Sequence, residues 1–457
     1  MPSETNVISS SQIPPTKGSL TAPLGLRRVL RLRDLVLLIV GTVIGSGIFL
    51  VPGLILRAVG NSVPIALSVW FLGGGLSLLG ALTYGELSAT NPEAGGLYVH
   101  IRDCFGRFPA FLFGWILFFV VSTGSVATLA VAFSNYLGEI CPLGPWAAKL
   151  VSLLMIGVIA LVNVRGTRVS ADLQNVTTAI KVLAILAIGA SLFYFGTRFH
   201  VSAAPPISAM PFTSRLSGIG LAIVSVLWAY EGWQYCTFAA GETINPRRDF
   251  PLAFLTGVLI LIGIYVFANL GYLAALGPDG VANSNRVAAT ALATVVSPTV
   301  AEAVTFAILV SMFSAANSIV LTAPRVYYAM AKDGLFFRRL AEVHPRFGTP
   351  AFAVGATSFW ASVLAVTGTF EQLLTYVVFV GWMFYALAAA TIFVYRKRET
   401  GESQKYRVPG YPWTPAVFIA VVAAFVVNTI IAQPARAAIG LGVVLTGAPA
   451  YLIWRKR

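Results

Sequence analysis

The sequence predicts an all-α polytopic membrane protein with about twelve transmembrane helices. Of its 457 residues, 57% are hydrophobic and only 11% are charged, and a soluble globular chain of this length cannot bury so much apolar surface. Twelve apolar segments follow one another, and no linker between them is long enough for a soluble domain. These segments cover residues 34–57, 63–87, 108–137, 146–163, 172–197, 216–240, 252–276, 300–330, 351–369, 372–395, 412–432 and 435–454.

The charges fix the expected orientation. Most of the 31 Lys and Arg residues lie in alternate linkers, which are therefore expected to be cytoplasmic, together with both termini. The net charge of +14 is explained by this topology, so nucleic acid is not expected as a partner, and the lipid bilayer is. Residues 1–26 are rich in Ser, Pro and Thr and lack the apolar core of a signal peptide, which predicts a disordered cytoplasmic tail.

The sequence offers no basis for a metal, a cofactor or a disulfide framework. Its three cysteines are Cys104, Cys141 and Cys236, too few for such a framework, and its three histidines lack metal-ligand spacing. Catalytic residues are not expected either, because HExxH, GxSxG and paired intramembrane aspartates are absent. We therefore expect a protein that is not an enzyme.

The first segment contains the run GTVIGSGIF, residues 41–49, in mid-span. Gly41, Gly45 and Gly47, with Ser46 between the last two, weaken a helix here because glycine has the largest entropic cost in a helix. Two half-helices that meet at 45–47 leave free N–H groups on the outer half and free C=O groups on the inner half. The first set attracts an anion and the second a cation. The break predicts a binding site for a zwitterion.

The fifth segment carries Lys181 within the run QNVTTAIKVLAIL. An unpaired ammonium inside a span is expensive, so it is expected to face the protein interior and to mark function. The alternative is a lysine that extends its charge to the membrane surface. Lys181 lies roughly 13 Å along the helix from the start of the segment, and this depth favours the functional interpretation.

The sixth segment contains a second candidate break at Glu231 and Gly232, within the run AYEGW. Segments one and six are the first members of two groups of five spans. Interruptions at corresponding positions of two halves indicate a transporter site built from inverted repeats. The alternative, that Gly232 only allows close helix packing, is less favoured because the two breaks match.

Polar residues also recur in the eighth segment, at Ser311, Ser314, Asn317 and Ser318. Ser311, Ser314 or Ala315, and Ser318 fall on one helical face. Two interpretations stay open: these side chains bond neighbouring helices, or they line a cavity.

Several motifs together resemble those of amino acid permeases of the amino acid–polyamine–organocation superfamily. They are GTVIGSGIF in segment one, AYEGW in segment six, INPRRDFP after it, HPRFGTP after segment eight and YRVPGYPW before segment eleven. The stretches 141–151 and 168–186 are most similar to the L-type amino acid transporters and their prokaryotic relatives. The resemblance covers the chain from about residue 27.

This resemblance implies a LeuT-type fold that works by alternating access, with a 5+5 inverted repeat and broken helices 1 and 6. Residues 27–457 would form one transmembrane transporter domain. Within it, 27–197 would be repeat one, 216–395 repeat two and 412–457 the last two helices.

The resemblance also implies how the substrate is held. Its carboxylate is expected at the first break and its amine at backbone carbonyls of both broken helices, with one aromatic side chain as a gate over it. The residues at these positions are Gly45, Ser46 and Gly47 for the carboxylate, Val43, Trp228 and Ala229 for the amine, and Trp228 for the gate, where the family usually has Phe.

Lys181 matches a lysine of the family whose ammonium lies where related sodium-driven transporters bind sodium, and Ser311 is its expected partner on span eight. The expected function is therefore sodium-independent transport of amino acids across the plasma (inner) membrane, by exchange of one amino acid for another. Proton-coupled transport, or transport of a polyamine or a cationic amino acid, is the alternative. A polyamine has no carboxylate for the N–H groups at 45–47.

Glu231 replaces a small residue of the L-type members, and its carboxylate could attract a cationic side chain, accept a proton or bond to neighbouring helices. A charge at mid-membrane is usually paired or protonated, which favours a structural or pH-tuning role in the pocket over cationic selectivity.

Cys141 lies in the loop where heteromeric animal members bond to a heavy-chain glycoprotein, but a single cysteine is a weak signal, so such a partner is not expected.

Two further classes of membrane protein remain as rivals. A channel needs a continuous polar pore lining or a filter loop, whereas the polar residues here cluster at mid-depth. A transporter-fold amino acid sensor would bind its ligand without moving it, and is usually joined to a signalling domain that this sequence lacks. Which amino acids are bound, the oligomeric state and the direction of transport do not follow from the sequence.

Overall fold

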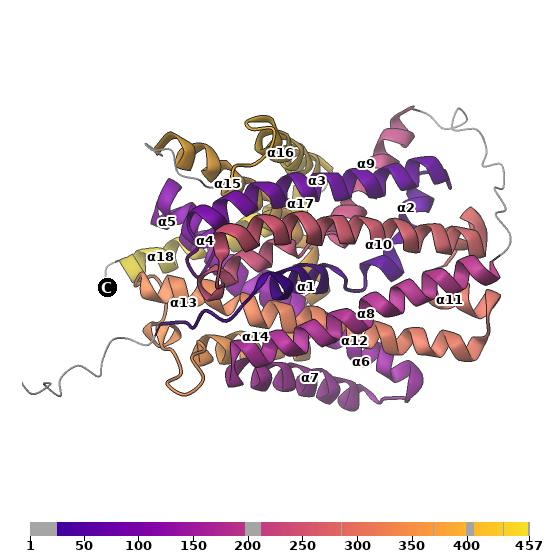
Figure 1. The fold of residues 1–457 in the computed structure, drawn as a ribbon, viewed down its shortest axis with the longest axis horizontal. Helices are drawn as coiled ribbons and strands as arrows, with labels where there is room; N and C mark the ends of the chain where they lie inside the picture. Colours follow the sequence, from indigo (N-terminus) through magenta and orange to yellow (C-terminus); the bar gives the residue numbers. More distant parts are fainter. Residues whose placement is uncertain are drawn as a thin grey trace, which may run out of the picture.

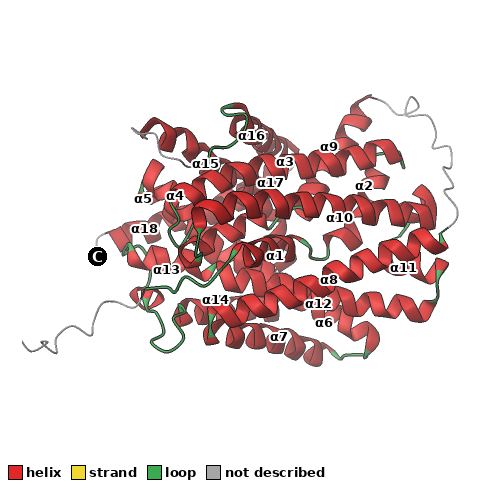
Figure 2. Cartoon of the chain, in the orientation of Figure 1, coloured by secondary structure: helices red, strands yellow, loops and turns green. Residues whose placement is uncertain are grey.

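The computed structural model describes residues 25–196, 212–284, 286–368, 370–398, 406–432 and 434–455. In this part of the chain the protein is a bundle of helices that run mostly along one direction (Figure 1). Figure 2 shows no strand among the described residues, and the loops lie mainly at the ends of the bundle. The predicted tail, residues 1–26, falls almost entirely outside the described residues.

The helices follow the predicted apolar segments closely. Their bounds are α1 (Leu32–Val43), α2 (Gly47–Ala58), α3 (Val63–Thr90), α4 (Leu97–Phe105), α5 (Arg107–Ile116), the π-helix η1 (Leu117–Val121), α6 (Ser122–Ile140), α7 (Pro145–Arg165), α8 (Thr167–Phe195), α9 (Phe212–Ala229), the 3-10 helix η3 (Trp233–Glu242), α10 (Pro246–Ala282), α11 (Val287–Val295), α12 (Pro298–Thr322), α13 (Pro324–Lys332), the 3-10 helix η4 (Arg338–Ala341), α14 (Ala351–Thr367), α15 (Phe370–Arg398), α16 (Trp413–Ala432), α17 (Pro434–Leu445) and α18 (Gly447–Arg455).

The described residues contain eight helical stretches that are long and apolar enough to cross a membrane, and α1 with α2 forms a ninth, bent one. The other three predicted segments correspond to α9, α14 and α15. α9 ends at the second break, and α14 is a shorter apolar helix of 17 residues. The chain is therefore a multi-pass, all-helical membrane protein, as the sequence predicts.

Two short helices were not expected. α4 lies in the polar stretch between the second and third spans, and α11 precedes α12. α4 begins after Gly96 and ends before Gly106, both with positive φ (45° and 93°). Glycine is the residue that tolerates this conformation, so the glycines of a stretch that reads as a loop mark the ends of a helix.

α10 lies at the centre of the bundle. It packs along α3 and also contacts α1, α8 and α2, and Figure 1 shows α3, α10 and α8 side by side. α12 packs against α6, α8 and α1. The two broken helices are thus surrounded by long continuous ones, which hold the breaks in place.

A buried ion pair fixes the second broken helix at the end of η3. The guanidinium of Arg325 on α13 donates to both carboxylate oxygens of Glu242, over 2.5 and 3.1 Å, and to the hydroxyl of Thr167 on α8 over 2.9 Å. All three side chains are buried. The backbone of Glu242 also accepts hydrogen bonds from the N–H groups of Val29 and Leu30, just before α1. The start of α1 and the end of η3 are therefore held together at this end of the bundle.

Candidate functional site

The break in the first segment lies where the glycines predict it. The axis bends by 48° between α1 and α2, and Ile44 has extended dihedral angles, φ −72° and ψ 90°. α2 begins at Gly47, and the side chain of Ser46 before it forms no capping hydrogen bond. Because the first N–H groups of a helix have no partner within it, the start of α2 presents backbone donors beside the Ser46 hydroxyl.

The second break separates α9 from η3. α9 ends at Ala229, and Gly232 has φ 127°, a conformation that a side chain rarely permits. A Cβ at position 232 would lie 3.0 Å from the side chain of Thr42 and 3.1 Å from its carbonyl group. Glycine is therefore required here for both conformation and close approach, and it brings the two breaks into contact.

Lys181 lies behind the first break. Its side chain is only 1% exposed, and its ammonium donates to the carbonyl oxygens of Gly41 (2.6 Å), Ile44 (2.7 Å) and Ser311 (3.4 Å). The hydroxyl of Ser311 donates to the carbonyls of Ile44 (2.9 Å) and Gly45 (3.2 Å). An ammonium has three donors, and carbonyl oxygens of this kind also coordinate sodium in broken helices. The structure thus brings Lys181 and Ser311 together at the end of α1, outside the cavity lining.

A residue that the sequence did not single out connects the two breaks. The hydroxyl of Tyr265 on α10 donates toward the carbonyl oxygens of Val43 (3.1 Å) and Ala229 (2.9 Å). These carbonyls end α1 and α9, where no intrahelical donor is available. Tyr265 is fully buried. In the sequence of an apolar span, a tyrosine that only packs cannot be distinguished from one whose hydroxyl caps two helices. The sequence therefore carries no signal for this role.

A cavity of about 120 Å³ lies between the two breaks, α6 and α12. Seven of the residues that the sequence predicts for the site line it, whereas Lys181 and Ser311 lie behind it. The lining residues are Thr42, Val43, Gly45, Ser46, Gly47, Ser125, Thr128, Leu129, Ala132, Trp228, Ala229, Glu231, Gly232, Tyr235, Ala315 and Ile319.

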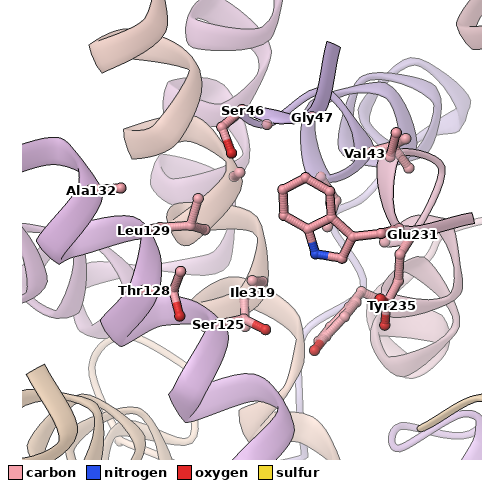
Figure 3. A pocket seen from close by; sticks show the side chains of 16 residues that line it. Val43, Ser46, Gly47, Ser125, Thr128, Leu129, Ala132, Glu231, Tyr235 and Ile319 are labelled. Carbon is pink, nitrogen blue, oxygen red and sulfur yellow. The ribbon is translucent and has the colours of Figure 1, made fainter. Parts of the chain in front are cut away.

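The polar groups of the cavity are divided between its sides. Figure 3 shows Ser46 and Gly47 at one edge, Ser125 and Thr128 on α6, and Glu231 with Tyr235 on the opposite side. A Cβ added at Gly45 would meet no atom within 4 Å, so a side chain there would enter the cavity. Backbone N–H groups at the start of α2, hydroxyls and the carbonyls at the ends of α1 and α9 therefore surround one small space, which suits a ligand with both an anionic and a cationic group.

Glu231 is tied to a third element. Its carboxylate accepts a hydrogen bond of 3.2 Å from the hydroxyl of Tyr385 on α15, whose own carbonyl accepts one of 2.8 Å from Tyr84 on α3. Among the described residues no Lys or Arg forms an ion pair with this carboxylate. Glu231 thus reaches the cavity while held by one hydroxyl.

The polar residues Ser314 and Asn317 of the eighth segment follow the first interpretation, because they bond to neighbouring helices and do not line the cavity. Asn317 donates to Gln174 on α8 and accepts from Asn163 on α7, both over 2.9 Å. Ser314 accepts from Gln174 over 3.0 Å. These side chains join α12 to α7 and α8, and Ala315 is the member of that helical face that lines the cavity. Cys141, the other residue singled out, is a free, exposed thiol at the end of α6.

Comparison with known proteins agrees with this geometry. A family model described as amino acid permease matches residues 30–452. The serine/threonine exchanger SteT of Bacillus subtilis is 31% identical over 437 residues, which cover 95% of this chain and 98% of that protein. The human cystine/glutamate transporter is 31% identical over 94% of this chain and 86% of its own length. The human large neutral amino acids transporter small subunit 2 is 29% identical over 97% of this chain and 83% of its own length. The chain belongs to the amino acid permease family of the amino acid–polyamine–organocation superfamily, whose members have the LeuT-type fold and are transporters.

Proposed function

We propose that this permease exchanges one amino acid for another without sodium. The observation that carries the proposal is the position of Lys181, whose ammonium is bonded to the carbonyls of Gly41, Ile44 and Ser311. A covalently fixed cation there leaves no coordination site for a sodium ion at the end of α1. Because the ammonium is part of the chain, it cannot cross the membrane with the substrate as a sodium ion would. The simplest driving force for transport is then the movement of a second amino acid in the opposite direction.

The substrate is bound across the first break in this proposal. Its carboxylate lies at Gly45, Ser46 and Gly47 and accepts from the backbone N–H groups of Ser46 and Gly47 and from the Ser46 hydroxyl, favoured by the dipole of α2. Its ammonium donates to carbonyls of Val43, Trp228 and Ala229. The Val43 carbonyl already accepts from the N–H of Gly45 and from Tyr265. The carbonyl of Trp228 accepts from the N–H of Glu231 and that of Ala229 from Tyr265, and because each carbonyl has two lone pairs, acceptor capacity remains at these two residues.

The size and lining of the cavity favour a small substrate. Its volume of about 120 Å³ is below the roughly 300 Å³ at which pockets for drug-sized ligands begin. Hydroxyls of Ser46, Ser125 and Thr128 face it, and the indole of Trp228 takes up space as a gate. We therefore expect small neutral or hydroxylated amino acids, and SteT, named a serine/threonine exchanger, fits this expectation.

A second candidate is proton-coupled transport or transport of a cationic amino acid. The observation that favours it is Glu231, a carboxylate that lines the cavity with one tyrosine hydroxyl as its described partner. The hydrogen bond from Tyr385 already gives the Glu231 carboxylate a structural role. We therefore rank a structural or pH-tuning role of Glu231 above selectivity for cationic substrates.

We also propose the orientation and the assembly. The positive charge of the linkers supports a cytoplasmic position of both termini, on the inner side of the plasma (inner) membrane, and the described chain begins and ends at the same end of the bundle (Figure 1). Cys141 is exposed and would be accessible to a heavy-chain-type partner, but we expect the chain to work without one.

Uptake of labelled serine into proteoliposomes tests the exchange. Vesicles are either empty or loaded with unlabelled serine, and the external medium lacks sodium. Uptake confined to loaded vesicles is the expected result. Uptake into empty vesicles that grows with an inward proton gradient would replace exchange by symport. Binding of serine without flux in either preparation would contradict transport and indicate a sensor.

A further inference from the structure

A second cavity, of about 330 Å³, lies at the end of the bundle where α10 begins. α3, the first three turns of α10 and the loop before α16 form its walls. The lining residues are Leu82, Arg247, Arg248, Pro251, Leu252, Leu255, Tyr406 and Pro409. None of them lines the substrate cavity, so this space has no part in the function proposed above.

Two exposed arginines give this cavity a positive charge. The guanidinium groups of Arg247 and Arg248 form no hydrogen bond or ion pair with any residue in the described ranges. The neighbouring carboxylate of Asp249 is buried and does not line the cavity. Arginine binds phosphate through paired N–H donors in a planar fork. Two such groups line the same cavity, which fits an anion of this geometry.

The wall below the arginines is apolar and exposed. Leu252, Leu255 and Leu259 follow Arg248 at steps of four, three and four residues, so all four share one face of α10. The three leucines are 38%, 36% and 49% exposed. Because α10 is a spanning helix, this face lies against hydrocarbon below the arginines. The site therefore combines two charged side chains at its entrance with an exposed apolar helix face that extends into the bilayer.

The loop before α16 adds a hydrogen-bond donor and is itself fixed. The hydroxyl of Tyr406 is buried and has no partner among the described residues, and burial raises the pKa of this phenol to about 12, so it remains a donor at physiological pH. The N–H of Val408 donates to Glu86 on α3. Glu86 also accepts two hydrogen bonds from Arg396, which compensate its charge. The negative charge of Glu86 near the site is thus compensated by Arg396.

We propose that this cavity binds the phosphate headgroup of an anionic phospholipid from the surrounding membrane. Arg247 and Arg248 bind the phosphate, Tyr406 donates to a headgroup oxygen, and an acyl chain follows the leucines of α10. Basic pockets between transmembrane helices at the cytoplasmic side are a recurrent form of anionic lipid recognition. A free phosphate shares the charge but lacks the chain that the exposed leucines would cover.

The test compares one double variant with a matched control. Arg247→Gln/Arg248→Gln removes the proposed charges, and Arg338→Gln/Arg339→Gln removes an exposed pair of arginines on η4 that lies outside the cavity. Each protein is purified in neutral detergent. Binding is measured by native mass spectrometry with phosphatidylglycerol, phosphatidylcholine and inorganic phosphate as separate probes, and the thermal unfolding midpoint is recorded with and without each probe.

The wild type and the Arg338/Arg339 variant should bind phosphatidylglycerol and unfold at a higher temperature in its presence. The Arg247/Arg248 variant should bind it roughly tenfold more weakly, as expected for lost charge-assisted bonds, with an unchanged midpoint without lipid. Equal weakening in both variants would reduce the effect to general surface charge and overturn the site. Equal binding of phosphatidylcholine, or equal stabilisation by inorganic phosphate, would overturn an anionic phospholipid as the ligand.

Tyr406→Phe gives an independent readout if the double variant does not fold. It removes the neutral donor of one residue that lines the cavity and leaves both arginines. Phosphatidylglycerol should bind about two- to tenfold more weakly, the range expected for one hydrogen bond. Unchanged binding in this variant would contradict the headgroup position proposed here.

Discussion

The hydroxyl of Tyr265 lies 2.9 Å from the carbonyl oxygen of Ala229, at the end of the first half of the second broken helix. The same hydroxyl lies 3.1 Å from the carbonyl of Val43, at the end of α1. One side chain of α10 therefore fixes the distance between the two sets of carbonyls that are proposed to hold the substrate ammonium. Its contribution to binding can be measured apart from its packing.

Tyr265→Phe removes the hydroxyl and keeps the ring. Without it the two carbonyls lose their shared donor, and we expect the affinity for substrate to fall about tenfold, equivalent to about 1.4 kcal/mol for a lost buried hydrogen bond. Concentration dependence of serine exchange measures this. Tyr272→Phe is the control, because Tyr272 is a buried tyrosine of the same helix whose hydroxyl has no described partner. Equal losses in both variants would mean that the effect comes from α10 packing.

Gly232→Ala is expected to abolish transport. The new Cβ would meet Thr42 at 3.0 Å in a conformation with φ 127°, and such strain costs about 1–3 kcal/mol. The two breaks would be pushed apart at the cavity. Gly263→Ala on α10 is the control, because a Cβ there would meet no atom within 4 Å and alanine favours a helix by about 0.5–1 kcal/mol. Flux and thermal stability of both variants are compared, and full activity of Gly232→Ala would contradict the close approach.

Glu231→Gln should alter the pH dependence of exchange more than the choice of substrate. Glutamine retains an oxygen that can accept from Tyr385 but has no charge and does not titrate. The measurement is the ratio of serine to lysine exchange over a range of pH. Tyr385→Phe, which removes the donor and keeps the carboxylate, separates the hydrogen bond from the charge. A change from lysine to serine transport in Glu231→Gln would assign cationic selectivity to this residue instead.

Acidification should destabilise the protein through His100. This residue lies on α4, outside the spans, is fully buried, and neither ring nitrogen has a described partner; burial lowers its pKa from 6.5 to about 4. Between these values the unfolded chain binds a proton that the folded chain does not, so stability falls as the pH falls. The loss is at most about 3 kcal/mol.

His100→Phe should remove that part of the pH dependence while retaining a ring opposite Tyr395, whose centroid lies 5.9 Å from that of His100. Thermal unfolding midpoints of the wild type and the variant, measured across the same pH window, test this. Identical slopes for the two proteins would show that His100 does not contribute.

The sequence predicts the spans and both breaks because their signals are local. Hydrophobic runs of spanning length give the helices, and the glycines at 45–47 and 232 give the interruptions. Lys181 stands out because a charge in a span is rare. Tyr265 could not be found this way, because its role depends on which distant carbonyls its hydroxyl reaches.

The limits of the helices also depend on tertiary contacts. α10 begins at Pro246, before the predicted segment 252–276. Pro246 occupies the first turn, where its missing N–H costs nothing. The helix kinks at Gly277, which has φ 67°, directly after the predicted end at 276, and continues to Ala282 beyond the kink. Composition marks the apolar centre of such a helix, but polar end turns that pack on neighbouring helices are not marked.

The central claim is that a fixed ammonium replaces a coupling ion at the end of α1. It is tested by measuring serine exchange by the Lys181→Ala variant in media with and without sodium. Lys181 is bonded to Gly41 and Ile44, so its loss removes the ammonium donor of the buried Gly41 carbonyl, at about 1–3 kcal/mol, and leaves the Ile44 carbonyl with the Ser311 hydroxyl. We predict that wild-type exchange is the same in sodium and in choline media. The variant should be inactive in choline, and sodium should restore part of the exchange by occupying the vacated carbonyls. Wild-type exchange that requires sodium, or a Lys181→Ala variant as active as the wild type in choline, would contradict the account.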